Sequence, residues 1–204
     1  MAEGRIYLVE DDEAVRDAIS LVLRAAGLDV QTYATAEAFL ATYTPSDEPE
    51  VFVVDVRLPR MSGLDLQRRL TRADSDASVI LITGHGDIPM ATRALKSGAM
   101  DFIQKPIEDT VLLTSIAEGI RRASDKKDRA IQLRDFATRV QSLTPREREV
   151  MMLVVGGASN KAVAAELGIS PRTVEVYRKR VMDKMRVRTL PDLVRIAESL
   201  RGAS

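Results

Sequence analysis

The stretch Asp-Val-Arg-Leu-Pro-Arg-Met-Ser-Gly at residues 55–63 decides the fold predicted for this sequence. It follows Val-Phe-Val-Val at residues 51–54, an uncharged run with the length and β-branched content of a buried strand. The carboxylate of Asp55 therefore ends a predicted strand. In open α/β sheets, the carboxyl ends of the strands form the edge at which functional groups gather.

Three other predicted strands also end in polar side chains, so one acidic pocket is expected at this edge. Clustered carboxylates repel one another, and a hard divalent cation with oxygen ligands removes that cost. Mg²⁺ fits this description best, and with a lysine it would neutralise a phosphoryl group moving onto Asp55. Taken singly, Asp12 could instead cap the helix that begins at Glu13. The predicted pocket contains Asp11, Asp12, Asp55, Thr83 and Lys105.

The first 123 residues alternate between short β-branched runs and segments of helical period, which indicates repeated βαβ units. The predicted fold class is therefore α/β, with a flavodoxin-like, doubly wound sheet of five parallel strands that helices cover on both faces. The predicted strands are residues 5–10, 29–33, 51–55, 79–83 and 100–104.

Charge divides the 204-residue chain into two opposite halves, although the formal total is zero. Residues 1–124 carry 13 Lys or Arg against 20 Asp or Glu, and residues 125–204 carry 17 against 10. An acidic module joined to one that meets a polyanion such as nucleic acid is the expected arrangement. The predicted domains are residues 1–123, a helical linker at 124–141 and a small all-α domain at 142–204.

The sequence contains no cysteine, which excludes disulfides and thiolate metal sites and suits a reducing cytosol. No uncharged apolar run approaches the roughly 18 residues that a membrane span needs. A cytoplasmic protein without a membrane partner is expected.

Capping signals separate the helices of the predicted C-terminal domain. Thr144 and Glu147 form a capping box around Pro145, and Gly168 supplies a tight turn after a helix at residues 160–167. The next helix begins after Ser170, so the order indicates a helix-turn-helix. The inward face predicted for this third helix consists of Val174, Val181 and Met185.

Residues 4–123 resemble the receiver domain of a two-component response regulator, because Asp55, Pro59 and Gly63 fill its signature D-x-x-x-P-x-x-x-G. The resemblance implies that a partner sensor histidine kinase phosphorylates Asp55. The implied catalytic residues are Asp55, Thr83 and Lys105, and the implied Mg²⁺ ligands are Asp11, Asp12, Asp55 and the carbonyl of Arg57.

The same resemblance implies a conformational switch. Thr83 is expected to move toward the phosphoryl group and Phe102 to turn into the vacated space, so that the changed surface promotes dimerisation. The bond between Lys105 and Pro106 is expected to be cis, as it typically is in such domains. His85 sits where residues of this family adjust the lifetime of the acyl phosphate, although a loop histidine without a role is an equal alternative.

Residues 142–202 resemble the DNA-binding domain of the FixJ, NarL and LuxR type, most clearly at residues 143–150 and 170–177. The third helix is then expected to enter the major groove of double-stranded promoter DNA, with Arg180 and Lys184 as additional cations for phosphates. The implied base contacts are Glu175, Val176 and Lys179, and the implied backbone contacts are Lys161, Arg172, Thr173, Tyr177 and Arg178. A later stripe, Leu193, Ile196 and Leu200, is either core or a dimer seam.

The sequence as a whole predicts a FixJ/NarL-type response regulator, a phosphoacceptor transcription factor that binds DNA as a homodimer, with RNA polymerase as a candidate further partner. Three alternatives are open. A phosphohydrolase with a nucleophilic aspartate usually carries a second acid two residues later, where this chain has Arg57. A flavodoxin-like nucleotide binder would hold a flavin, and the same two domains could act through protein–protein contacts instead of DNA.

Overall fold

The computed structural model describes residues 4–72, 78–84 and 88–201, without the side chains of residues 72, 88–91 and 199–201. Internal contacts divide the chain into two units, residues 1–127 and 128–204, and each unit has its own core. Within the described residues, no helix is both long and apolar enough to cross a membrane.

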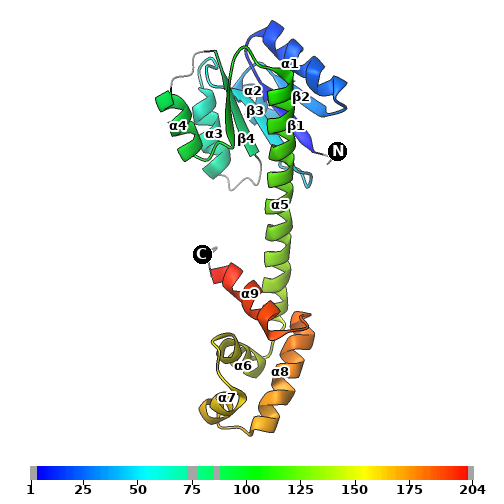
Figure 1. Ribbon diagram of the computed structural model, residues 1–204, viewed down its shortest axis with the longest axis vertical. Coiled ribbons are helices and arrows are strands. Elements are labelled where there is room, and N and C mark those ends of the chain that lie inside the picture. Colours follow the sequence, from blue (N-terminus) through cyan, green and yellow to red (C-terminus); the bar gives the residue numbers. More distant parts are fainter. Residues whose placement is uncertain (1–3, 73–77, 85–87, 202–204) are drawn as a thin grey trace. The chain divides into compact units, whose positions relative to one another are not determined.

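The first unit contains a parallel sheet of five strands (Figure 1). The strands are β1 (Arg5–Val9), β2 (Asp29–Tyr33), β3 (Glu50–Asp55), β4 (Ser78–Thr83) and β5 (Asp101–Gln104). They pair in the order β2-β1-β3-β4-β5, which confirms the predicted doubly wound fold. Every residue of β3 and β4 is buried, which explains why these strands are the apolar runs that stand out in the sequence.

Helices cover both faces of the sheet. One face packs against α1 (Glu13–Ala25) and the first part of α5 (Asp109–Gln141). The other face packs against α2 (Ala36–Thr42), α3 (Gly63–Arg72) and α4 (Ile88–Lys96). Successive strand side chains point to opposite faces, so β1 contributes Ile6 and Leu8 to one core and Tyr7 and Val9 to the other.

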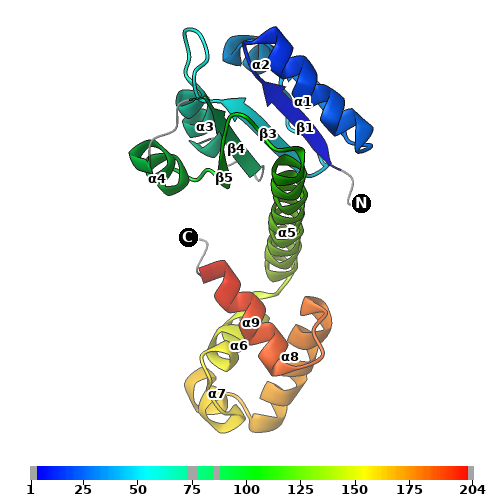
Figure 2. The ribbon, with the colours of Figure 1, turned by 45° about the horizontal axis from the view of Figure 1, so that its top comes forward.

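The second unit is entirely helical, as predicted (Figure 2). Its core also includes the end of α5, because Phe136 is only 2% exposed and belongs to the cluster of Leu143, Met185 and Leu193. The predicted linker is therefore helical, and its residues from 128 onward group with the C-terminal helices. These helices are α6 (Pro145–Val155), α7 (Asn160–Leu167), α8 (Pro171–Met185) and α9 (Leu190–Arg201).

Local capping fixes where these helices begin and end. Thr144 and Glu147 form the predicted capping box: the Glu147 N–H donates to Thr144 Oγ1 at 3.3 Å, and the Thr144 N–H donates to Glu147 Oε2 at 2.8 Å. Ser159 and Ser170 cap α7 and α8. Gly168 has a φ of 64°, the left-handed conformation expected for the turn between them.

Candidate functional site

Backbone pairing brings the carboxyl ends of the central strands together. Asp55 ends β3, and the Val56 N–H that follows donates to the carbonyl of Ile82 at 2.9 Å. The Lys105 N–H donates to the carbonyl of Thr83, the buried last residue of β4, at 2.7 Å. Asp55, Thr83 and Lys105 therefore lie at one edge of the sheet.

Gly63 lets the loop after β3 fold back against Asp55. A Cβ atom at Gly63 would lie 2.1 Å from the carbonyl oxygen of Asp55, a distance that the backbone cannot tolerate. The Gly63 N–H donates to the carbonyl of Val56 at 3.0 Å, which holds the loop in this position. The glycine of the signature is thus required by the backbone that carries Asp55.

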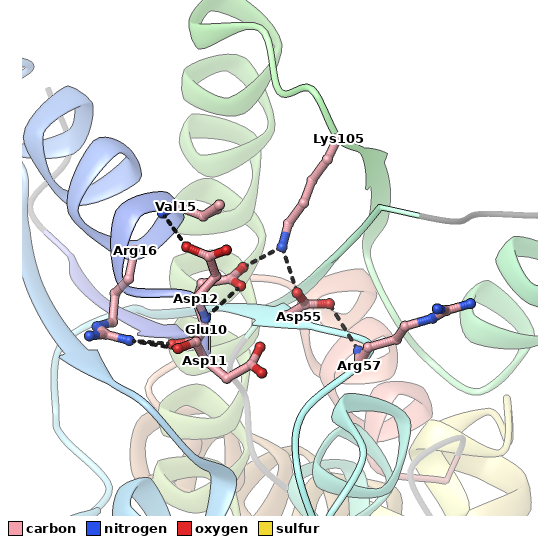
Figure 3. A network of polar contacts seen from close by, with 8 residues as sticks. All are labelled: Glu10, Asp11, Asp12, Val15, Arg16, Asp55, Arg57 and Lys105. Atoms are coloured by element: carbon pink, nitrogen blue, oxygen red, sulfur yellow. Dashed lines mark hydrogen bonds and ion pairs between the residues drawn. The ribbon is translucent and has the colours of Figure 1, made fainter.

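Lys105 reaches between two buried carboxylates (Figure 3). Its Nζ lies 2.5 Å from Asp55 Oδ2 and 2.7 Å from Glu10 Oε2. The other oxygen of Asp55 accepts from the backbone N–H of Arg57 at 2.9 Å, while the Arg57 side chain extends away from the carboxylates. The peptide bond between Lys105 and Pro106 is cis, as expected.

Three carboxylates form a cluster here, and two of them pair with Lys105. One oxygen each from Glu10, Asp11 and Asp55 lies within 4.8 Å of the other two. Among the described residues, Lys105 is the cation that pairs with these acids, so three carboxylates leave an excess of negative charge in a site where Glu10 and Asp55 are buried. Oxygen donors in this number and spacing suit a hard divalent cation such as Mg²⁺.

The cluster contains Glu10 where the sequence predicted Asp12. Asp12 Oδ1 accepts from the Val15 N–H at 3.1 Å, so this side chain caps α1, the structural alternative recognised in the sequence. Glu10 was interpreted as the last residue of a strand, but β1 ends at Val9. The signal that could have found Glu10 is its position directly after the apolar run, as the first of the consecutive acids.

The environment of the cluster changes the proton affinities of Glu10 and Lys105. The pKa of Glu10 is raised to about 7: burial is the largest cause, the hydrogen bond from Lys105 opposes the rise, and the charge of Asp55 adds to it. Burial lowers the pKa of Lys105, but its hydrogen bonds to Asp55 and Glu10 outweigh burial, so the net pKa is raised. The lysine therefore stays charged, but it supplies a single positive charge against the three carboxyl groups of the cluster.

Phe102 is, with Thr83, a residue of the predicted switch. Phe102 pairs with Leu81 in the β4–β5 ladder, and its half-buried ring packs against the core beneath α2, α3 and α4. His85 lies outside the described residues.

Helix α8 has the two faces that the sequence predicts. Val174, Val181 and Met185 are at most 2% exposed and form part of the core. The opposite face is solvent-exposed, and Val176 is 48% exposed although it is apolar. The exposed candidates for DNA contacts are Lys161 on α7 and Arg172, Glu175, Val176 and Lys179 on α8.

The other candidate DNA contacts are partly engaged within the protein. Arg178 donates to Asn160 Oδ1 at 2.7 Å, which joins α8 to α7, and Tyr177 packs against the core between these helices. Thr173 takes part in the cap of α8 through Ser170, with 2.8 Å between their hydroxyl oxygens. These three side chains therefore also hold the helix-turn-helix together.

Lys184 has a structural partner that sequence reasoning missed. Its Nζ lies 2.6 Å from Glu147 Oε2 and 3.3 Å from the carbonyl of Ser142, although the sequence suggested a phosphate contact. The hydrogen bond from Lys184 lowers the pKa of Glu147, and the capping bonds from Thr144 act in the same direction. The pair fastens the last turn of α8 to the start of α6.

The stripe on α9 is placed in part. Leu193 is 1% exposed and lies in the C-terminal core, and Ile196 is half-buried against it. The side chain of Leu200 lies outside the described residues. At least the first position of the stripe is core.

Comparisons with known proteins identify both units. Residues 6–117 match the response regulator receiver domain family, and residues 141–197 match the luxR family of bacterial regulatory proteins. The chain belongs to the response regulators. This response regulator is 43% identical to the transcriptional regulatory protein FixJ of Bradyrhizobium diazoefficiens, over 96% of the chain and 95% of the relative.

Solved structures agree with this assignment. The response regulator is similar to StyR, with a TM-score of 0.80 and 38% identity over 97% of this chain and 99% of that chain. It is also similar to full-length FixJ from B. japonicum, with a TM-score of 0.57 and 40% identity over 99% of both chains. A receiver domain joined to a LuxR-type DNA-binding domain is consistent with regulation of transcription, and the predicted FixJ/NarL resemblance is confirmed.

Proposed function

We propose that Asp55 takes a phosphoryl group from a phosphohistidine of a partner sensor histidine kinase. A carboxylate oxygen of Asp55 bonds to phosphorus while the phosphorus–nitrogen bond breaks, so the product is an acyl phosphate and the histidine leaves. The observation that carries the proposal is the buried Asp55 at the end of β3, with Lys105 Nζ 2.5 Å from Oδ2. Slow hydrolysis would restore Asp55, so the protein acts as a switch rather than as a metabolic enzyme.

We assign Mg²⁺ to this site, with Glu10, Asp11, Asp55 and the carbonyl of Arg57 as ligands. The clustered oxygens and the excess of negative charge support this set. Asp12 is left out because its carboxylate caps α1. When bound, Mg²⁺ supplies positive charge that offsets the charge of the incoming phosphoryl group.

The response to phosphorylation is proposed to pass through Thr83 and Phe102. The Thr83 hydroxyl and the Lys105 ammonium would contact phosphoryl oxygens, and Phe102 would turn into the space that Thr83 leaves. Moving a two-state equilibrium from mostly off to mostly on needs about 5 kcal/mol of differential stabilisation. The altered surface would then promote a homodimer.

The homodimer is proposed to bind promoter DNA and there to meet RNA polymerase. Helix α8 would enter the major groove, and the two-fold symmetry of the dimer would match two inverted half-sites. Exposure of Glu175, Val176 and Lys179 supports their role at base edges. The proposed contacts to the DNA backbone are Lys161, Arg172, Thr173, Tyr177 and Arg178.

Phosphoryl uptake is tested by incubating the protein with acetyl phosphate and Mg²⁺ and mapping the modified peptide by mass spectrometry. The wild type should carry the phosphoryl group on Asp55, and Asp55→Asn should carry none while keeping its fold. Asp47→Asn, an exposed loop acid, is the matched control and should be modified normally. A phosphoryl group on another side chain would overturn the proposal.

DNA binding is tested by selecting genomic fragments with and without phosphorylation and then measuring affinity against salt. Arg172→Ala should weaken binding, and the slope of log K against log salt should fall by about one, because Arg172 is proposed to neutralise a backbone phosphate. Lys126→Ala, an exposed lysine of α5, serves as the control and should change neither quantity. Retention of no DNA fragment by the phosphorylated wild type would contradict a DNA-binding output.

A further inference from the structure

Arg16 of α1 contacts the main chain of the acidic turn rather than any carboxylate. Its guanidinium Nη1 donates to the carbonyl of Glu10 at 2.8 Å and to the carbonyl of Asp11 at 3.3 Å (Figure 3). The side chain is half-buried, and no ion pair of Arg16 occurs in the part of the chain that the structure describes. A cation beside three acids thus uses its donors on peptide oxygens.

The two carbonyls belong to the two residues whose side chains join Asp55 in the acidic cluster. Two other contacts hold the same turn: the Val15 N–H of α1 donates to Asp12 Oδ1 at 3.1 Å, and within the turn the Asp12 N–H donates to Glu10 Oε1 at 3.3 Å. Of these contacts, only those from Arg16 bind the peptide carbonyls of both Glu10 and Asp11. They therefore restrain the backbone from which the carboxylates of Glu10 and Asp11 project.

We infer that Arg16 is a positioning residue of the cation site, which sets the affinity for Mg²⁺ by fixing the directions of the Glu10 and Asp11 carboxylates. This inference rests on the proposed function, because it assigns Arg16 to the Mg²⁺ site of that proposal. Groups that orient metal ligands without touching the metal typically change metal affinity by about 10- to 100-fold when they are removed. A half-buried guanidinium with two backbone acceptors belongs at the lower end of that range.

Positioning and simple charge predict opposite results for the neutral variant. Through its charge alone, Arg16 repels a divalent cation, so Arg16→Gln would tighten Mg²⁺ binding and Arg16→Lys would leave it unchanged. Through positioning, both variants weaken binding, because glutamine loses the paired contact and lysine, with a compact ammonium, reaches one carbonyl at most. The sign of the change therefore separates the two explanations.

The experiment is a calorimetric titration of the full-length protein with MgCl₂, which suits a chain without tryptophan. The dissociation constant is expected to rise about tenfold in Arg16→Gln and roughly threefold in Arg16→Lys. Arg24→Gln removes the same charge from the last turn of the same helix and should stay within about twofold of the wild type. Thermal unfolding in the absence of Mg²⁺ shows whether each variant is folded, and Arg16→Lys decides if Arg16→Gln is not.

An unchanged or tighter dissociation constant in Arg16→Gln, or wild-type affinity in Arg16→Lys, overturns the positioning role while leaving the proposed function intact. Failure of the wild-type protein to bind Mg²⁺ overturns the proposed cation site itself, and the role of Arg16 falls with it. Equal weakening in Arg24→Gln would show that the effect does not depend on the contacts to the Glu10 and Asp11 carbonyls and would also overturn the inference.

Discussion

Two buried glutamates, one in each unit, have pKa values that are shifted in opposite directions. The side chains of Glu10 and Glu147 are 0% and 4% exposed, and each lies within 2.7 Å of a lysine Nζ. The pKa of Glu10 is nevertheless raised to about 7, with burial as the largest cause, whereas the hydrogen bond from Lys184 outweighs burial and lowers the pKa of Glu147. Burial and a lysine partner are therefore not enough to decide the charge of an acid.

The balance of neighbouring charges makes the difference. Glu10 shares Lys105 with Asp55, and Asp11 adds a third carboxylate. Glu147 has Lys184 as its ion-pair partner and also accepts the Thr144 N–H. Unbalanced charge suits the proposed Mg²⁺ and phosphoryl site, and balanced charge is typical of a structural contact.

The largest loss of stability should come from Phe136, which lies near the end of α5 and belongs to the core of the C-terminal unit. Phe136→Ala is expected to cost the C-terminal unit about 4 kcal/mol, because it removes a fully packed ring from the core. Native-state hydrogen exchange of the α6–α8 amides measures this loss in the intact chain. Ile131→Ala, on the same helix but 62% exposed, should cost less than about 0.5 kcal/mol. Equal effects would mean that the end of α5 is a linker only.

The next prediction tests whether Glu147 stabilises the contact between α6 and α8. Glu147→Ala should destabilise the C-terminal unit by about 2 kcal/mol, because it leaves the Thr144 N–H without its partner and removes the ion pair of Lys184, whose exposed ammonium water can solvate. The same exchange measurement applies. Glu149→Ala, which removes an exposed acid from the same helix, is the control and should have little effect. A cost for Glu147→Ala as small as that of the control would contradict the comparison.

When Mg²⁺ is removed, the stability that depends on Glu10 should fall as pH rises. An acid whose pKa is raised on folding stabilises the protein fully below its unfolded pKa of about 4.5, and this stability is lost as pH rises through about 7. In EDTA, the first unit should lose between about 1 and 3 kcal/mol from pH 4.5 to 8, since one pKa unit corresponds to about 1.4 kcal/mol. Urea denaturation measures the loss.

Glu10→Gln is the matched variant for this measurement, since it keeps the shape of the side chain and removes the charge. Its stability in EDTA should vary less with pH than that of the wild type, and its affinity for Mg²⁺ should be lower. If the stability of the wild type in EDTA changed no more between pH 4.5 and 8 than that of Glu10→Gln, the pKa of Glu10 would not be raised on folding, and the prediction would be wrong.

Local signals in the sequence were enough for the fold and for most of the pocket. The strand before Asp55 is a continuous apolar run, the capping box of Thr144 and Glu147 lies within four residues, and Gly63 is fixed by its spacing from Asp55. Each of these features is decided by neighbours along the chain, so each can be recognised without coordinates.

Contacts between distant residues were beyond such reasoning. Among the consecutive acids after β1, the choice of Glu10 rather than Asp12 depends on where the strand ends and on which side chain turns back to cap α1. Lys184 and Glu147 meet across 37 positions, so the lysine looks like one more exposed cation of a basic helix. Burial of Phe136 likewise depends on the tertiary fold of the C-terminal helices.

The smallest expected effect is the loss of stability of the C-terminal unit when Glu147 is protonated at low pH. An acid whose pKa is lowered on folding stabilises the protein above its unfolded pKa, and this stability is lost as pH falls toward the folded value. The C-terminal unit should therefore weaken on acidification below about pH 5, in the direction opposite to the first unit in EDTA. Urea denaturation of Glu147→Gln against the wild type, from pH 6 to pH 3, measures this slope. The variant should lose less stability over that interval, because its amide does not titrate, whereas identical slopes would mean that the Lys184 bond adds nothing to the charged form of Glu147.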